Sequence, residues 1–116
     1  MTTEEKIIEM VADHFDVSID EMKVITRCRT IVEARQIVFY LCRKTLPLTL
    51  KKIGVLLHKG HATVVHSISA VEKRMDVYPL ERQVIIKFLQ QINECKEFDK
   101  AVKCEEVFQE NDFYLN

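Results

Sequence analysis

The scarcity of glycine and proline is the feature that most constrains how this chain can fold. Its 116 residues include only two glycines and two prolines, whereas the pair usually makes up roughly 12% of a protein. Hairpins, β-sandwiches and glycine-rich phosphate loops depend on these residues for their turns. The composition is otherwise that of a folded domain, with 47% hydrophobic and 30% charged residues. We therefore expect an all-α fold that forms a single domain over residues 1–116.

Neither a membrane span nor a secretory signal is predicted. The longest run without Asp, Glu, Lys or Arg extends from Gly60 to Val71, which is too short and too polar to cross a bilayer. The first residues, MTTEEK, lack the basic-then-apolar pattern of a signal peptide. The four cysteines form no CxxC pair and are interpreted as reduced thiols that act as small hydrophobic residues. We expect a cytoplasmic protein with no membrane partner.

Charge is distributed unevenly along the chain, although the net charge is only −1. Residues 1–21 carry one basic and seven acidic side chains, and residues 67–116 carry seven basic and ten acidic ones. Residues 22–66 carry nine basic side chains and one acidic side chain, a net charge of +8. An excess of this kind is typical of a surface that lies against nucleic-acid phosphates. The alternative interpretation is a solvated basic face between two acidic segments.

In the first half of the chain, apolar spacing and capping patterns predict three helices, over residues 3–14, 19–23 and 30–44. The patterns Ser-x-x-Glu at Ser18 and Thr-x-x-Glu at Thr30 are capping boxes that predict the start of the second and third helices. Residues 24–29 have no helical period and are interpreted as a basic loop. The third helix is apolar on nearly all sides, so we expect it to be central, with Arg35 and Arg43 off the core.

In the second half, Pro47 is expected to end the third helix because proline cannot continue the helical hydrogen-bond ladder. Thr49 is expected to cap a helix over residues 50–57, and a turn follows in which Gly60 takes a positive φ. The inward residues of this helix are predicted to be Leu50, Ile53, Val55 and Leu56. Further helices are predicted over residues 61–75, 79–94 and, more weakly, 96–109, which gives six to seven helices in all.

The helices over residues 50–57 and 61–75, joined by a short turn that contains glycine, have the dimensions of a helix-turn-helix. The second helix of such a pair enters the major groove of DNA, where its first side chains can contact base edges. The hydrogen-bonding residues suited to this role, expected on the outer face of the second helix, are His61, Thr63, His66 and Ser67. The alternative interpretation is an ordinary solvated helix face.

Several short motifs follow one another in a defined order around this pair of helices. Ala34-Arg35-Gln36 lies in the long central helix, Leu50-x-x-Ile53-Gly54 begins the pair, and His61-x-Thr63-Val64-x-His66 follows the basic turn. In this order and spacing, the chain resembles the C-terminal DNA-binding domain of the bacterial replication initiator DnaA, from about Ile7 to Arg74. The resemblance implies a Trp-repressor-like helical bundle with a DNA-binding core over residues 7–75. Residues 79–116 would then form a C-terminal helical extension.

The resemblance also implies a division of labour on duplex DNA. Arg35 matches an arginine that enters the minor groove, and His61 and Thr63 match residues that approach bases in the major groove. Lys59, in the basic turn, would add a phosphate or base contact, and the basic loop would hold the phosphate backbone. Together with the charge and groove arguments, the expected DNA-binding residues are Lys23, Arg27, Arg29, Arg35, Lys51, Lys59, His61, Thr63, His66 and Ser67.

Two positions next to His61 depart from the family pattern. The family usually has Asp before this histidine and Thr after it, whereas Gly60 and Ala62 stand here. An Asp can accept a hydrogen bond from a cytosine amino group, which neither Gly nor Ala can do, so the base preference stays open. The sequence also contains no GxxxxGK[ST] nucleotide-binding motif. We therefore expect a free-standing relative of the initiator without its ATPase domain.

Other functions were weighed against DNA binding. The spacing of His58, His61 and His66 matches no closed zinc pattern, and no nucleophile elbow or glycine-rich loop is present. We expect no catalytic residue, no cofactor and no metal. The aromatic residues have helical core spacing, which argues against a platform for single-stranded nucleic acid. The alternative function is a protein-interaction or regulatory module that has lost base-specific reading, and a homodimer through the C-terminal helices also stays open.

Overall fold

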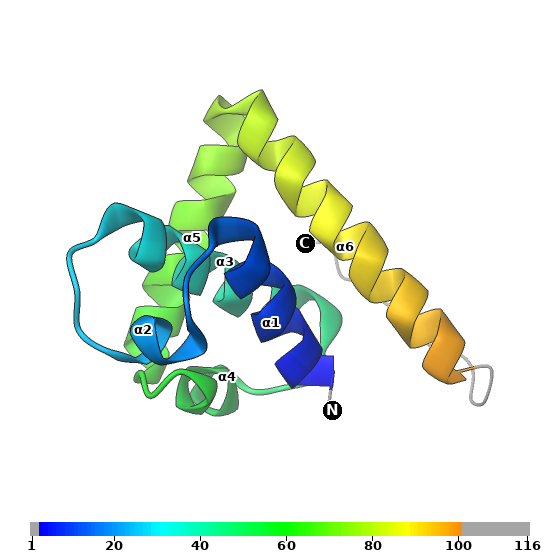
Figure 1. Ribbon diagram of the computed structural model, residues 1–116, viewed down its shortest axis with the longest axis horizontal. Helices are drawn as coiled ribbons and strands as arrows, with labels where there is room; N and C mark the ends of the chain where they lie inside the picture. Colours follow the sequence, from blue (N-terminus) through cyan, green and yellow to red (C-terminus); the bar gives the residue numbers. More distant parts are fainter. Residues whose placement is uncertain (1–2, 101–116) are drawn as a thin grey trace.

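The computed structural model describes residues 3–100, and the side chains of residues 3–94. This part of the chain contains no strand and folds into six helices: α1 Thr3–Phe15, α2 Ile19–Lys23, α3 Arg29–Thr45, α4 Leu50–Leu56, α5 His61–Val77 and α6 Pro79–Lys100 (Figure 1). The predicted all-α class is confirmed. A separate helix beginning at Lys96 is wrong, because α6 continues through Lys100; the rest of the predicted 96–109 segment lies outside the described residues.

Helix α3 forms the centre of the bundle, as its nearly uniform apolar pattern predicted. It contacts each of the other five helices, with its largest interface against α5 and the next against α1. Its buried apolar side chains are Ala34, Ile37, Val38, Phe39, Tyr40, Leu41 and Cys42. The other helices each cover a part of this surface with one apolar stripe, which is the usual way in which amphipathic helices share a core.

The two predicted capping boxes have different outcomes. Ser18 caps α2 as expected, since its Oγ accepts from the Glu21 N–H at 3.0 Å while Glu21 Oε1 accepts from the Ser18 N–H at 2.8 Å. The box at Thr30 is wrong, because α3 begins at Arg29 with Cys28 as an N-cap that makes no side-chain bond. Glu33, the acceptor that this box required, instead pairs with Arg29 Nε at 3.1 Å.

Helix α4 begins as predicted and turns Leu50, Ile53 and Leu56 toward the core as expected, but not Val55. Thr49 caps it, with its Oγ1 accepting from the Lys52 N–H at 3.2 Å. The prediction that Val55 points inward is wrong, because Val55 is 62% exposed while Leu57 is fully buried. Leu57 lies one turn after the buried Ile53 and so continues its face of the helix, whereas Val55 lies on the opposite side.

The turn between α4 and α5 uses a different residue from the one predicted. Gly60 has φ −80°, and the left-handed position is taken by His58, with φ 60°. The glycine that the turn requires is Gly54, inside α4, because a Cβ there would lie 2.4 Å from the Lys59 carbonyl oxygen. The chain doubles back closely enough for the Lys59 N–H to donate to the Gly54 carbonyl at 2.8 Å.

Helix α6 turns back from α5 at a sharp elbow, as Figure 1 shows, and packs against α1, α3 and α5. Arg74 holds this elbow, with Nε 2.6 Å from Glu81 Oε2 and Nη1 2.7 Å from Gln36 Oε1. The inner side of α6 buries Ile85, Phe88 and Ile92. Within the described residues, none of the helices has the length and apolar character needed to cross a membrane.

Candidate nucleic-acid interface

The first turns of α5 present the polar side chains that the sequence nominated, with one exception. His61, Thr63 and His66 are exposed, as expected of residues that approach base edges. Ser67 is only 4% exposed, so its predicted place on the outer face is wrong. It lies three residues after the buried Val64 and four before the buried Val71, and its small side chain completes their stripe where α5 packs against α3 and α4.

The N-terminus of α5 carries no side-chain cap. Gly60 is the N-cap residue and makes no side-chain hydrogen bond, and the first turn contains no acidic residue. The first amides of a helix have no partner within the helix, and the helix dipole adds partial positive charge to them. This end of α5 therefore suits an approaching phosphate.

The basic loop, residues 24–28, connects α2 to α3 and stands away from the helices at the left of Figure 1. Arg27 and Cys28 are exposed within it, and Arg29, at the start of α3, is exposed as well. A hydrogen bond from the Cys28 N–H to Thr26 Oγ1 at 3.0 Å bends its C-terminal end. The predicted open basic loop is thus present, one residue shorter than expected because α3 begins at Arg29.

Lys59 joins the helix-turn-helix to the basic loop. Its Nζ donates to the Lys23 carbonyl at 3.2 Å and to the Val24 carbonyl at 3.4 Å, so the turn and the loop lie side by side. Burial lowers the pKa of the Lys59 ammonium, and the positive charge of Arg35 lowers it further. Lys59, which was predicted to contact DNA directly, is therefore already hydrogen-bonded within the protein, where it links the turn to the basic loop.

Arg35 is buried, and the prediction that it lies off the core is wrong. Only 8% of the residue is exposed, and its Nε has no hydrogen-bond partner in the described part of the chain. Arg35 lies on the most central helix of the bundle, which contacts each of the other five described helices. Burial lowers the pKa of the guanidinium. Arg43 does lie off the core, exposed, with Nη1 donating to the Leu48 carbonyl at 3.2 Å.

The remaining cations divide between this surface and other parts of the bundle. Lys51 is exposed in the first turn of α4, within the helix-turn-helix, as its predicted phosphate contact requires. Lys44 instead pairs with Glu72 at 3.7 Å. Sequence reasoning missed Ile25, which is almost fully exposed in the basic loop; its apolar character gave no signal for a surface contact.

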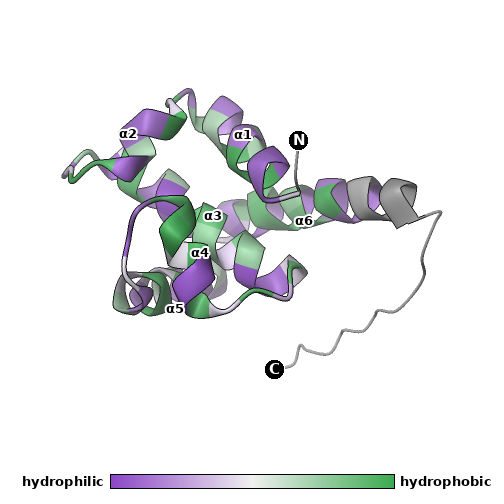
Figure 2. Cartoon of the chain, turned by 90° about the horizontal axis from the view of Figure 1, so that it is seen from below, coloured by the Kyte–Doolittle hydropathy of each residue, from purple (hydrophilic) through white to green (hydrophobic). Residues whose placement is uncertain are grey.

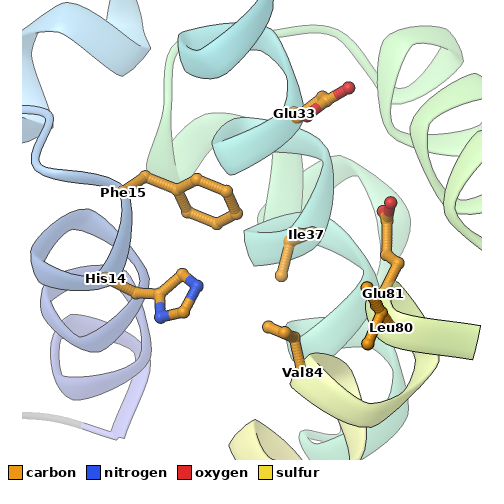
Figure 3. A pocket seen from close by; sticks show the side chains of 7 residues that line it. All are labelled: His14, Phe15, Glu33, Ile37, Leu80, Glu81 and Val84. Carbon is orange, nitrogen blue, oxygen red and sulfur yellow. The ribbon is translucent and has the colours of Figure 1, made fainter.

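A separate cavity of about 240 Å³ lies between α1, α3 and α6 (Figure 3). Its lining residues are His14, Phe15, Glu33, Ile37, Leu80, Glu81 and Val84, so α4 and α5 contribute none. The carboxylates of Glu33 and Glu81 disfavour a phosphate there. Across the described residues, no three His, Cys, Asp or Glu side chains gather in an arrangement that could hold a metal ion.

Comparison with known proteins decides the family. Residues 4–71, which span α1 to most of α5, match the family model described as "Bacterial dnaA protein helix-turn-helix". The chain belongs to this family. The match confirms the resemblance inferred from the ordered motifs, and a helix-turn-helix of this family implies DNA binding.

Relatives in the DnaA family are similar over most of this chain. The chromosomal replication initiator protein DnaA of Cutibacterium acnes is 37% identical over 97 residues, which cover 83% of this chain and 19% of the relative. The protein of the same name from Lachnoclostridium phytofermentans is 39% identical over 88 residues, 75% of this chain and 19% of the relative. The chromosomal replication initiator protein DnaA of Thermosipho africanus is 37% identical over 100 residues, which cover 86% of this chain and 21% of the relative. The chain therefore spans about a fifth of the length of these relatives.

Proposed function

We propose that this chain binds duplex DNA with α5 in the major groove and the basic loop on the neighbouring phosphate backbone and minor groove. The observation that carries the proposal is the bond between Lys59 and the basic loop. It holds the open N-terminus of α5 next to the loop that carries the exposed Arg27 and leads to the exposed Arg29. A recognition helix and a flanking cationic segment can then engage one stretch of DNA together.

The proposed contacts fall into two groups. Lys23, Arg27, Arg29 and Lys51 neutralise phosphates, which supplies salt-sensitive affinity without reading sequence. His61, Thr63 and His66 contact base edges and supply any selectivity. Ser67 is left out of the reading group because it is buried, and Lys59 acts through the position of the loop. We place this activity in the bacterial cytoplasm, on the nucleoid, in the control of replication or transcription.

The minor-groove role of Arg35 remains a proposal with a structural condition. The Arg35 residue is largely buried, so a groove contact requires its guanidinium to extend further toward the surface on binding, which its partnerless Nε would favour. We expect Arg35→Ala to weaken duplex binding by about 1–3 kcal/mol. Urea unfolding of the same variant separates a lost contact from a damaged core. Unchanged duplex affinity would rule the role out.

The decisive experiment is fluorescence anisotropy with two duplexes, one carrying the initiator-type box and one scrambled, each at two salt concentrations. Affinity should fall steeply with salt, by a log–log slope of about −0.9 for each phosphate contacted. Tighter binding to the box would establish sequence reading. Equal binding to both duplexes would leave a non-selective DNA binder, and no binding at low salt would reject the proposal.

A matched double variant tests whether the departures beside His61 alter base reading. A Cβ at Gly60 meets no atom within 4 Å, and its φ suits any residue, so Gly60→Asp with Ala62→Thr can restore the family pattern without strain. If the original chain binds both duplexes equally while the double variant prefers the box, these two positions account for the lost selectivity.

A protein-interaction module is the second candidate function. Val77, Tyr78 and Leu80 are exposed together at the elbow between α5 and α6, and exposed apolar groups of this kind mark interaction sites. The C-terminal helices could also support a homodimer through this region. Binding of this kind should change little with salt, whereas binding to phosphates should not persist at high salt.

A further inference from the structure

One apolar side chain stands out on the basic face. Ile25 is 94% exposed, the highest value among the large hydrophobic residues of the described chain, and its neighbour Val24 is 54% exposed. Val24 is the first residue of the basic loop and Ile25 the second, and Figure 2 shows hydrophobic colouring in this loop, beside α2 at the left edge of the molecule. The basic loop therefore presents an apolar side chain beside its cations to any ligand that docks on this face.

The position of Ile25 relative to α5 is set by Lys59. The two carbonyls that accept from Lys59 Nζ belong to Lys23 and Val24, so the backbone is held up to the residue immediately before Ile25. Lys59 itself lies two residues before the first residue of α5. If α5 occupies a major groove, a segment this close to its N-terminus can lie over the phosphate backbone that separates this groove from the neighbouring minor groove.

We propose that Ile25 is an apolar minor-groove contact, which packs against deoxyribose and base edges when the basic loop docks on duplex DNA. The inference rests on the proposed DNA binding. Apolar side chains that enter the minor groove partly unstack a base step and bend the duplex. Steps that deform easily, such as TA and CA/TG, should therefore be preferred under the loop, which adds selectivity at base pairs that α5 does not touch.

The cations around Ile25 make this insertion feasible. Lys23 precedes it by two residues and Arg27 follows it by two, so positive charge lies on both sides of the apolar side chain. These side chains can neutralise the phosphates that border the groove, where opposing strands come closest together and bending raises their mutual repulsion. The loop region thereby combines salt-sensitive phosphate contacts with an apolar contact whose strength does not depend on salt.

The test compares duplex binding and bending by the full chain and three variants. Ile25→Ser removes the apolar contact, Ile25→Val retains most of it, and Leu80→Ser is the matched control, since Leu80 is another aliphatic residue that is 77% exposed but lies on α6. Both sites are exposed, so the urea midpoints of all three variants should stay unchanged. Affinity is measured by anisotropy over several salt concentrations, and bending by energy transfer between dyes at the duplex ends, with a TA step placed under the loop.

We expect Ile25→Ser to weaken binding about tenfold and to reduce bending, with the same salt dependence as the original chain. Ile25→Val and Leu80→Ser should behave like the original chain. The proposal is overturned if Ile25→Ser binds and bends the duplex as the original chain does, or if its loss of affinity comes with a changed salt slope. Absence of duplex binding by the original chain would reject the proposed function, and this inference with it.

Discussion

The turn of the helix-turn-helix and the basic loop lie side by side but are held in different ways. Backbone bonds close the turn, from the Leu57 and Lys59 N–H groups to the Gly54 carbonyl at 3.1 and 2.8 Å, and the Leu57 side chain is fully buried beneath it. The basic loop is exposed at most of its residues, and the two bonds from Lys59 hold only its first end. Backbone bonds and side-chain packing thus position the turn, whereas a few polar bonds position the basic loop.

This difference suggests separate tasks for the two regions in DNA binding. A helix whose direction is set by the core meets DNA already oriented, so little ordering entropy is lost on binding. A loop with few internal contacts can adjust to the width of a groove. We therefore expect selectivity at α5 to depend on side-chain identity, and selectivity at the loop to depend on the shape and deformability of the DNA.

The largest expected difference between the packed core and the basic loop is in the reactivity of two cysteine thiols. Burial, with a smaller contribution from Glu4, raises the pKa of the Cys42 thiol to about 12, whereas Cys28 is exposed in the loop. At pH 8 a thiol of that pKa is ionised in about one molecule in 10⁴, against about one in ten for a thiol with the ordinary pKa of 9.0. We expect iodoacetamide to alkylate Cys42 at least ~10³-fold more slowly than Cys28, measured by peptide mass spectrometry.

The raised pKa of the Cys42 thiol also predicts whether the fold gains or loses stability at high pH. The unfolded chain releases this proton near pH 9.0, while the folded chain keeps it until about pH 12. The unfolded state therefore binds fewer protons in this window, and the contribution of Cys42 to stability decreases as the pH rises through it. Cys42→Ala should lessen the loss in urea midpoint between pH 8 and pH 10. Rapid native alkylation of Cys42 would instead show that α3 opens readily.

Substitutions at the two glycines should affect the closed turn, and with it the stability of the fold, to very different extents. Gly54→Ala would place a Cβ 2.4 Å from the Lys59 carbonyl oxygen, which is backbone and cannot move without opening the turn, so we expect a loss of about 3 kcal/mol. Gly60→Ala is the control, because its Cβ meets no atom within 4 Å, and should change stability by at most about 0.5 kcal/mol. Urea unfolding gives both values. Equal effects would mean that the turn is not tightly closed.

The link between the two regions can be cut at Lys59. Lys59→Met removes both bonds to the loop carbonyls while keeping an unbranched apolar stem, and we expect duplex affinity to fall about tenfold because the loop is no longer held beside α5. Lys51→Met removes another cation of the helix-turn-helix without touching the loop. It should lower affinity less and reduce the salt slope by about one phosphate contact. Indistinguishable effects on affinity and slope would show that Lys59 acts on phosphate directly.

Local patterns in the sequence sufficed for most of the helices because their causes are local. The Ser18 capping box and the Thr49 cap each involve residues within three positions of one another, and apolar periodicity identified α3 as central. The failures occurred where an equally local rival was present, as when Glu33 paired with Arg29. Gly60 was expected in the left-handed conformation, but the close return of the chain at Gly54 leaves that conformation to His58.

The candidate interface shows which properties of the site the sequence could predict and which depend on tertiary packing. The order of motifs and the basic segment, residues 22–66, were enough to assign the family and to nominate exposed residues such as His61, Thr63 and Arg27. Which polar groups are buried depends on how many helices cover a position, and this is a property of packing. The burial of Arg35 and the bonds of Lys59 to the Lys23 and Val24 carbonyls follow from contacts between segments distant in sequence, which no local pattern encodes.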